Sequence, residues 1–200
     1  MNLNQHLKAA FEQKLVIQFA NSMNNNRFAD TQAMAGVCQE LCWKWLKRLK
    51  RQPLLYSNAD TRMNAFFDKQ KTIVKAMDRH NHQAKNLHRY PFEYYGFLKS
   101  EVNTIGLDKH KTIENWQKEG GGIFIMFLMS DGNLSHAIAA YKFPNNGASG
   151  WHRKKVLCFD PNYGEYEINP GDINGWLRTL LVEKYGCTEL AINTLWHLKP

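Results

Sequence analysis

Residues 120–143 are GGGIFIMFLMSDGNLSHAIAAYKF, and they mark a change from helical to strand periodicity. The three glycines are typical of a turn, and the apolar run at 123–129 has the length and composition of a buried strand. Residues 130–133 are a strong hairpin-turn signal, so residues 134–143 are predicted to return as the antiparallel partner strand. We therefore expect a sheet that begins here with a hairpin.

The sheet is expected to continue towards the C-terminus. Segments 156–159 and 165–168 have β-type composition, and the turn residues 160–164 (DPNYG) separate them. Residues 170–184 are predicted as a helix and residues 187–198 as a final strand. Short strands joined by tight turns indicate a largely antiparallel sheet.

The part of the chain before residue 120 is predicted to be helical, because its apolar residues recur at three- and four-residue intervals. The predicted helices span residues 2–19, 36–51, 60–85 and 109–118. Helices followed by an antiparallel sheet indicate the α+β class. We expect one domain over residues 1–200, divided into an N-terminal helical segment (1–30), a helical lobe (31–120) and a sheet lobe (121–200).

The composition is that of a globular protein, since 44% of the 200 residues are hydrophobic and 22% are charged. No apolar run approaches the roughly 20 residues of a membrane helix. Hydrophilic residues follow Met1 directly, so a Sec signal peptide is not expected. Four scattered cysteines are too few for a disulfide scaffold and favour a reducing compartment; they are Cys38, Cys42, Cys158 and Cys187.

The charge balance is basic, with a net charge of +8 and a pI near 9.3. Such a charge favours anionic partners. Basic residues gather at the end of the second predicted helix, at Lys47, Arg48, Lys50 and Arg51. A run of this kind is either a solvated helix end or a patch for an anionic membrane or nucleic acid.

Cys38 lies at the start of the second predicted helix, where free N–H groups and the helix dipole stabilise the nucleophilic thiolate. His136 lies on the return strand of the hairpin and Asp160 ends the next strand, so adjacent antiparallel strands can bring imidazole and carboxylate together. A nucleophile needs a base that a third group orients, and these three residues are the candidates. The structural alternatives are a buried cysteine, a hydrogen-bonded strand histidine and a turn-forming aspartate. Cys42, one turn further on, is expected to pack in the core.

Three stretches contain the candidates: residues 36–45 (GVCQELCWKW), 135–139 (SHAIA) and 159–165 (FDPNYGE). Together they resemble the YopT/AvrPphB family of papain-like bacterial effector cysteine proteases. The resemblance implies a papain-like α+β fold, with the nucleophile at the start of a central helix packed on an antiparallel sheet. It also implies thiol proteolysis, with Cys38 as nucleophile, His136 as general base and then acid, and Asp160 as the group that orients the imidazole.

Papain-like enzymes place a glutamine six residues before the nucleophile, and Gln32 has this spacing from Cys38. The resemblance therefore implies that the Gln32 amide and the backbone N–H of Cys38 form an oxyanion hole. No cofactor or metal is expected. His80, His82 and His88 do not fit a metal site, because residues two apart on a helix point in different directions.

The expected function is a cysteine endopeptidase that cleaves a protein in a target cell or its own precursor. We expect a secreted bacterial effector or toxin domain, exported without a Sec signal by a specialised system and acting in the target-cell cytoplasm, with no nucleic-acid partner. Acyl transfer, deamidation and transglutamination pass through the same acyl-thioester, so such an enzyme is the first alternative. The second is a non-catalytic basic module that binds an anionic membrane or nucleic acid.

Overall fold

The computed structural model describes residues 1–23, 37–51, 58–83, 102–103, 109–129, 135–144, 155–188 and 191–199. Seven strands form one sheet: β1 (Leu7–Ala10), β2 (Val102–Asn103), β3 (Gly121–Leu128), β4 (Ser135–Lys142), β5 (Val156–Asp160), β6 (Gly164–Ile168) and β7 (Ile192–Leu198). The α-helices are α1 (Gln13–Met23), α2 (Cys38–Arg51), α3 (Ala59–Phe67), α4 (Gln70–Gln83), α6 (Lys109–Glu119) and α7 (Ile173–Thr179). Two 3-10 segments, Leu3–Gln5 and Pro170–Asp172, and a π-helical turn, Leu180–Lys184, complete these elements.

The sheet is antiparallel throughout, with the strand order β1-β6-β5-β4-β3-β7-β2. The predicted hairpin is confirmed, because β3 pairs with β4 and places Phe127 opposite His136. The next strand, β5, pairs with β4 and places Phe159 opposite Ala139. The predicted hairpin turn at 130–133 lies outside the described residues.

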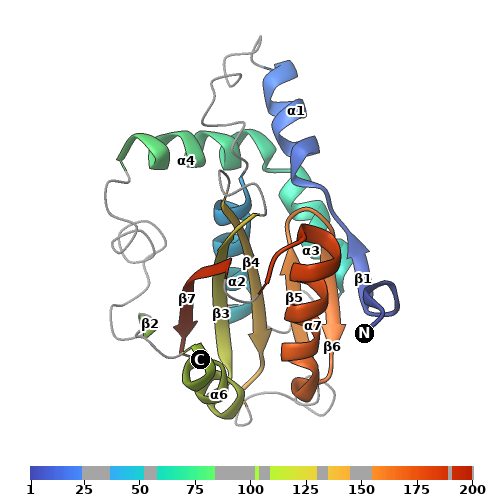
Figure 1. Cartoon of the computed structure of the whole chain (residues 1–200). Coiled ribbons are helices and arrows are strands. Elements are labelled where there is room, and N and C mark those ends of the chain that lie inside the picture. The colour runs from blue at the N-terminus through green and yellow to red at the C-terminus, as the bar shows by residue number, and fades with distance from the viewer. Residues whose placement is uncertain are drawn as a thin grey trace.

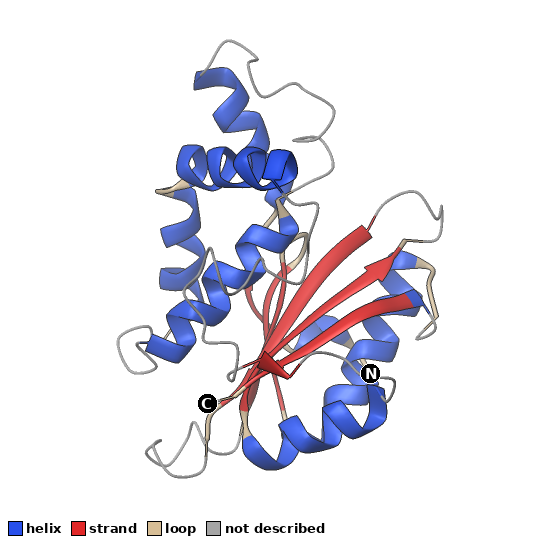
Figure 2. Cartoon of the chain, turned by 90° about the vertical axis from the view of Figure 1, so that its left-hand side faces the viewer, coloured by secondary structure: helices blue, strands red, loops and turns tan. Residues whose placement is uncertain are grey.

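Helices cover both faces of the sheet (Figure 1), with α1 to α4 on one side and α6 and α7 on the other (Figure 2). Each face has its own hydrophobic core. Phe124 of β3 belongs to the core beneath α2, whereas Ile125 and Phe127 belong to the core beneath α6 and α7. Successive side chains of a strand point to opposite faces, so a strand that is buried on both faces reads as the continuous apolar run seen in the sequence.

Two tryptophans hold α2 against the sheet. Trp43 stacks on Phe124 with ring centroids 4.4 Å apart, and Trp45 stacks on Phe159 at 5.5 Å. Both indole rings are fully buried. They therefore anchor α2 in the core.

A buried ion pair adds a polar anchor between helix and sheet. Glu165 of β6 accepts hydrogen bonds from Trp45 Nε1 at 2.8 Å and from Arg62 Nε at 2.6 Å, and Arg62 Nη2 bonds its second carboxylate oxygen. A bidentate guanidinium–carboxylate pair has a fixed geometry. It therefore helps to set how α2 and α3 lie on the sheet.

The prediction of one helix over residues 2–19 is wrong. The segment forms a 3-10 turn, strand β1 and only then α1, because Leu7–Ala10 pairs with β6 and becomes the edge strand of the sheet. Leu7 and Leu15, which the helical stripe would have buried, are 37% and 44% exposed. Pairing within the sheet has thus overridden the local helical pattern, as tertiary context often does.

The other boundaries differ less. The predicted helix 60–85 is divided by a turn at Asp68 and Lys69 into α3 and α4, and the predicted helix 170–184 is a succession of 3-10, α and π segments. The last strand begins at Ile192 rather than Cys187, and the short strand β2 was not predicted. Within the described part of the chain, no helix has the length and apolarity needed to cross a membrane.

Candidate active site

Cys38 is the first residue of α2, and its side chain is 6% exposed. The acidic residue Glu40 lies in the first turn of this helix and the basic residues Arg48, Lys50 and Arg51 in its last turn, which suits the helix dipole. The first-turn N–H groups of a helix have no acceptor within the helix. The thiol of Cys38 therefore lies at the positive end of a helix that is fixed to the sheet.

His136 and Asp160, two of the predicted site residues, are in direct contact. His136 is the second residue of β4 and Asp160 the last of β5, and His136 Nε2 lies 3.0 Å from Asp160 Oδ1. The two residues are 2% and 0% exposed. The prediction that neighbouring antiparallel strands bring them together is confirmed.

The environment of His136 favours its charged form. Burial alone lowers the pKa of His136, but the charge and hydrogen bond of Asp160 oppose this effect. The neighbouring Cys38 acts in the same direction as Asp160, and the pKa of His136 rises to about 10. Because Nε2 faces Asp160, Nδ1 is the ring nitrogen left for Cys38. The influence of Cys38 on this pKa indicates that its thiol lies near the imidazole, whose Nε2 is paired with Asp160.

Two further residues complete the hydrogen bonds of Asp160. The backbone N–H of Asn162 lies 2.8 Å from Oδ1, and the hydroxyl of Tyr185 lies 3.0 Å from Oδ1 and 2.8 Å from Oδ2. Asn162 Nδ2 donates in turn to the Tyr185 hydroxyl at 3.1 Å. Burial, with the charge of Asp160, raises the pKa of Tyr185, so its hydroxyl remains a neutral donor.

The sequence reading missed both of these residues. Asn162 lies in the motif 159–165. An asparagine soon after an aspartate in a tight turn often hydrogen-bonds within the turn, so its position could have indicated a contact with Asp160. Tyr185 follows the π-helical turn and reaches Asp160 from a separate element. No local pattern links it to the site.

Cys42 is a second thiol near Cys38, but its surroundings differ. It is completely buried, and its Sγ donates to the carbonyl oxygen of Ala137 at 3.4 Å. Burial, and then the charges of Cys38 and Asp160, raise the pKa of Cys42 well above its ordinary value. Its predicted packing in the core is confirmed.

The remaining predicted features lie elsewhere or outside the described residues. Gln32 falls outside them, as does His88, and nothing is described of the side chains of His80 and His82. Among the described residues, no group of three or more His, Cys, Asp or Glu side chains could hold a metal ion. Arg48, one of the four basic residues at the end of α2, donates to the carbonyl oxygens of Arg62 and Ala65. Its guanidinium therefore helps to hold α3 against α2.

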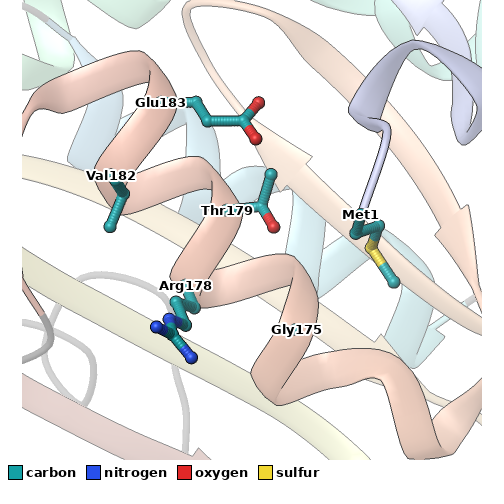
Figure 3. A pocket seen from close by; sticks show the side chains of 6 residues that line it. All are labelled: Met1, Gly175, Arg178, Thr179, Val182 and Glu183. Carbon is teal, nitrogen blue, oxygen red and sulfur yellow. The ribbon is translucent and has the colours of Figure 1, made fainter.

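A hollow of about 400 Å³ on the outer side of α7 lies apart from these residues (Figure 3). Its lining comes from the N-terminus, α7 and the π-helical turn, namely from Met1, Gly175, Arg178, Thr179, Val182 and Glu183. Neither Cys38, His136 nor Asp160 contributes to it. The hollow therefore takes no part in the arrangement described above.

Comparison with known proteins connects the fold to a solved structure. No protein-family model matches the chain, and no curated protein sequence matches it. The crystal structure of the Pseudomonas avirulence protein AvrPphB superposes on it with a TM-score of 0.53, covering 99% of this chain and 98% of that chain at 15% identity. The chain shares its fold with AvrPphB.

The likeness to AvrPphB confirms the predicted fold class, an α+β, papain-like arrangement with a helix packed on an antiparallel sheet. AvrPphB is also one of the two proteins that give their names to the family resembled by the three motifs. At 15% identity the match concerns the fold.

Proposed function

We propose that the chain is a cysteine endopeptidase, with Cys38 as nucleophile, His136 as general base and acid, and Asp160 as the residue that orients the imidazole. The observation that carries the proposal is the 3.0 Å contact between His136 Nε2 and Asp160, and the position of Cys38 at the start of α2 supports it. The fold shared with AvrPphB supports it.

In the first half of the proposed reaction, the Cys38 thiolate attacks the carbonyl carbon of the scissile amide. The C–N bond then breaks, and His136, protonated at neutral pH by virtue of its raised pKa, gives the Nδ1 proton to the leaving amine. The product is an acyl-thioester on Cys38. Asp160 keeps Nε2 occupied throughout, which holds the other ring nitrogen towards sulfur and substrate.

In the second half, neutral His136 removes a proton from water as the water oxygen attacks the thioester. The C–S bond breaks, the carboxylic acid product leaves, and the thiolate–imidazolium pair is restored. The acyl donor and the acceptor together determine the reaction class. An amine in place of water as the acceptor gives transamidation. A glutamine side chain in place of the peptide bond as the donor gives deamidation. Acyl transfer chemistry of these kinds is the alternative within the same site.

The oxyanion of each tetrahedral intermediate needs hydrogen-bond donors. We assign this role to the backbone N–H of Cys38 and to the amide of Gln32, on the spacing of the two residues in the sequence. A donor of this kind typically contributes about 3 kcal/mol to the stability of the transition state. None of these steps calls on a cofactor.

The proposed substrate is a protein of a target cell, or the precursor of this chain. The motif resemblance and the shared fold with an avirulence protein support a bacterial effector or toxin domain, delivered by specialised secretion to the target-cell cytoplasm. Residues 1–200 would act as one catalytic domain. An anionic membrane is the proposed docking surface.

The test compares a target-cell proteome treated with wild type and with Cys38→Ala, using mass spectrometry that labels new N-termini. We expect new N-termini that depend on Cys38. Glutamine-to-glutamate conversion or new isopeptide links, without cleavage, would instead assign deamidation or transglutamination. Identical proteomes would contradict an enzymatic function on these proteins. Slow alkylation of Cys38 near neutral pH in the same preparation would show that Cys38 is not an activated nucleophile.

A further inference from the structure

Gln13 connects two parts of the proposed active site that are far apart in the sequence. It is the first residue of α1 and is 8% exposed. Its side-chain Nε2 donates to Asn162 Oδ1 at 2.7 Å, and its Oε1 accepts the backbone N–H of Val37 at 3.0 Å. Val37 immediately precedes Cys38. Both ends of the Gln13 amide are therefore in use, one on each side of the site.

The main chain around Gln13 is tied to the turn between β5 and β6. The Gln13 backbone N–H donates to the carbonyl oxygen of Pro161 at 2.8 Å, and that of Phe11 donates to Tyr163 at 3.4 Å. At the start of β6, an alanine at Gly164 would place its Cβ 1.9 Å from the carbonyl oxygen of Ala9, so β1 and β6 run in close contact. The Gln13 side chain thus extends from a fixed point to the start of α2.

The other end of the connection reaches Asp160. The backbone N–H of Asn162 donates to Asp160 Oδ1, and its side-chain Nδ2 donates to the Tyr185 hydroxyl that also bonds Asp160. A continuous set of hydrogen bonds therefore runs from Asp160 through Asn162 and Gln13 to the residue before Cys38. Only a side chain with both a donor and an acceptor can occupy the middle of this set.

We propose that Gln13 is a positioning residue, which sets the separation between the Cys38 thiol and the His136–Asp160 pair. The inference rests on the proposed function, because the separation of these three groups matters only if they act together in catalysis. Thiolate and imidazolium stabilise each other only at hydrogen-bond distance, and a displacement of about 1 Å in an active site can cost 100-fold in rate. Gln13 touches neither the thiol nor the imidazole in the contacts described, so its effect acts through Val37 and Asn162.

The test measures how fast iodoacetamide alkylates Cys38 as a function of pH, with the modified cysteine identified by peptide mass spectrometry. Gln13→Met keeps the length of the side chain and removes both hydrogen bonds. We expect alkylation at pH 6–7 to slow by about tenfold or more, and alkylation at high pH, where every accessible thiol is ionised, to match wild type. A residue that only stabilised the fold would lower the melting temperature and leave this pH profile unchanged.

Two further variants make the result specific. Gln13→Glu keeps the acceptor for Val37 but lacks the donor for Asn162, so it should also lose reactivity near neutral pH, and it serves if Gln13→Met fails to fold. Gln117→Met is the matched control, because Gln117 of α6 also joins two segments, donating from Nε2 to the carbonyl oxygen of Pro170 at 3.4 Å. Helix α6 packs in the core on the other side of the sheet from α2. Gln117→Met should retain the wild-type profile.

The outcomes separate this inference from the proposed function. Wild-type profiles in folded Gln13→Met and Gln13→Glu, together with slow alkylation in His136→Ala, would reject the positioning role and leave the proposed protease intact. If wild type and His136→Ala alkylate equally slowly at neutral pH, the thiolate–imidazolium pair is absent and both proposals fail. Slow neutral-pH alkylation in the Gln13 variants and in His136→Ala, with a wild-type profile in Gln117→Met, supports both.

Discussion

The Tyr185 hydroxyl lies 2.8 Å from Oδ2 of Asp160, and the Tyr185 ring lies 5.0 Å from the His136 imidazole. Asp160 is completely buried, so its carboxylate depends on such donors to offset the loss of solvation. Tyr185 therefore supports the proposed orienting residue with its hydroxyl and encloses the imidazole with its ring.

We expect Tyr185→Phe to keep the fold and the ring contact but to lower activity by several-fold. The variant removes one donor from Asp160 and leaves Asn162 Nδ2 without its hydroxyl acceptor. Loss of a hydrogen bond to a charged group costs about 1.5–3 kcal/mol of unfolding free energy, which denaturant titration measures. Activity and stability equal to wild type would show that the hydroxyl contributes nothing to the site.

Cys38 and Cys42 should differ sharply when each is replaced. Cys38→Ala should abolish turnover in a folded protein, because the proposed nucleophile is lost. Cys42→Ala should retain most activity, since Cys42 Sγ bonds only the Ala137 carbonyl oxygen among its described partners. It should lose about 1 kcal/mol of stability through the small cavity and the missing hydrogen bond. An active Cys38→Ala with an inactive, folded Cys42→Ala would reverse the assignment.

The raised pKa of His136 predicts how stability changes with pH. Its unfolded pKa is near 6.5, and the folded value is about 10 because the charges of Asp160 and Cys38 outweigh burial. The folded state therefore binds the proton more tightly. This contribution is complete below about pH 6.5 and is lost as the pH rises towards 10.

Denaturant unfolding at several pH values between 7 and 9.5 measures this loss. The slope for one group is about 1.4 kcal/mol per pH unit, and His136→Ala should show a shallower decline than wild type. Parallel curves for the two proteins would mean that His136 is not held protonated by its neighbours.

The basic end of α2 predicts weak binding to anionic vesicles. Lys44, Lys47 and Arg51 are three and four residues apart on α2, so these cations lie on one side of the helix. Partial burial and the charges of Arg51 and Lys44 lower the pKa of Lys47. Each cation near an acidic membrane is worth about 1 kcal/mol, and salt of about 0.5 M should abolish the interaction. Lys47→Gln/Arg51→Gln should reduce co-sedimentation with acidic vesicles at low salt.

Arg48→Gln provides the contrast for this experiment. Arg48 bonds the backbone of α3 and lies 5.0 Å above the Phe66 ring, so its loss should lower stability rather than vesicle binding. Equal sedimentation of wild type with neutral and acidic lipid would discard the membrane proposal and leave the thiol chemistry untouched.

The sequence could predict those parts of the fold and site that local patterns determine. The start of α2 near Cys38 and the hairpin that carries His136 follow from periodicity and turn residues. The approach of His136 to Asp160 follows from the neighbouring positions of β4 and β5. Each of these features depends on contacts between adjacent elements.

The parts that could not be predicted depend on contacts between distant segments. Strand β1 exists because β6 offers a free edge, and its own residues have a helical pattern. Gln13 meets Asn162 across 149 positions, and Arg62 meets Glu165 across 103. Polar side chains of this kind have no signature in one sequence, because their partners become visible only when the sheet is assembled.

Replacement of Asp160 separates its charge from its hydrogen bond. Asp160→Asn can still accept the His136 N–H through its amide oxygen, and its amide N–H can donate to the Tyr185 hydroxyl in place of the present bond. Without the charge, the pKa of His136 should fall, so the alkaline limit of activity should move to lower pH. We expect Asp160→Asn to retain about a tenth of the activity, within the range that general acid–base catalysis contributes.

Asp160→Ala removes the acceptor as well, so His136 loses its orientation. The backbone N–H of Asn162 and the Tyr185 hydroxyl also lose their shared acceptor in a buried site. We expect activity to fall by about 100-fold or more, and unfolding free energy to fall by about 1–3 kcal/mol. Rates and pH profiles measured for the three folded proteins decide the role of Asp160. Near wild-type activity in both variants would reduce it to a residue that shapes the turn between β5 and β6.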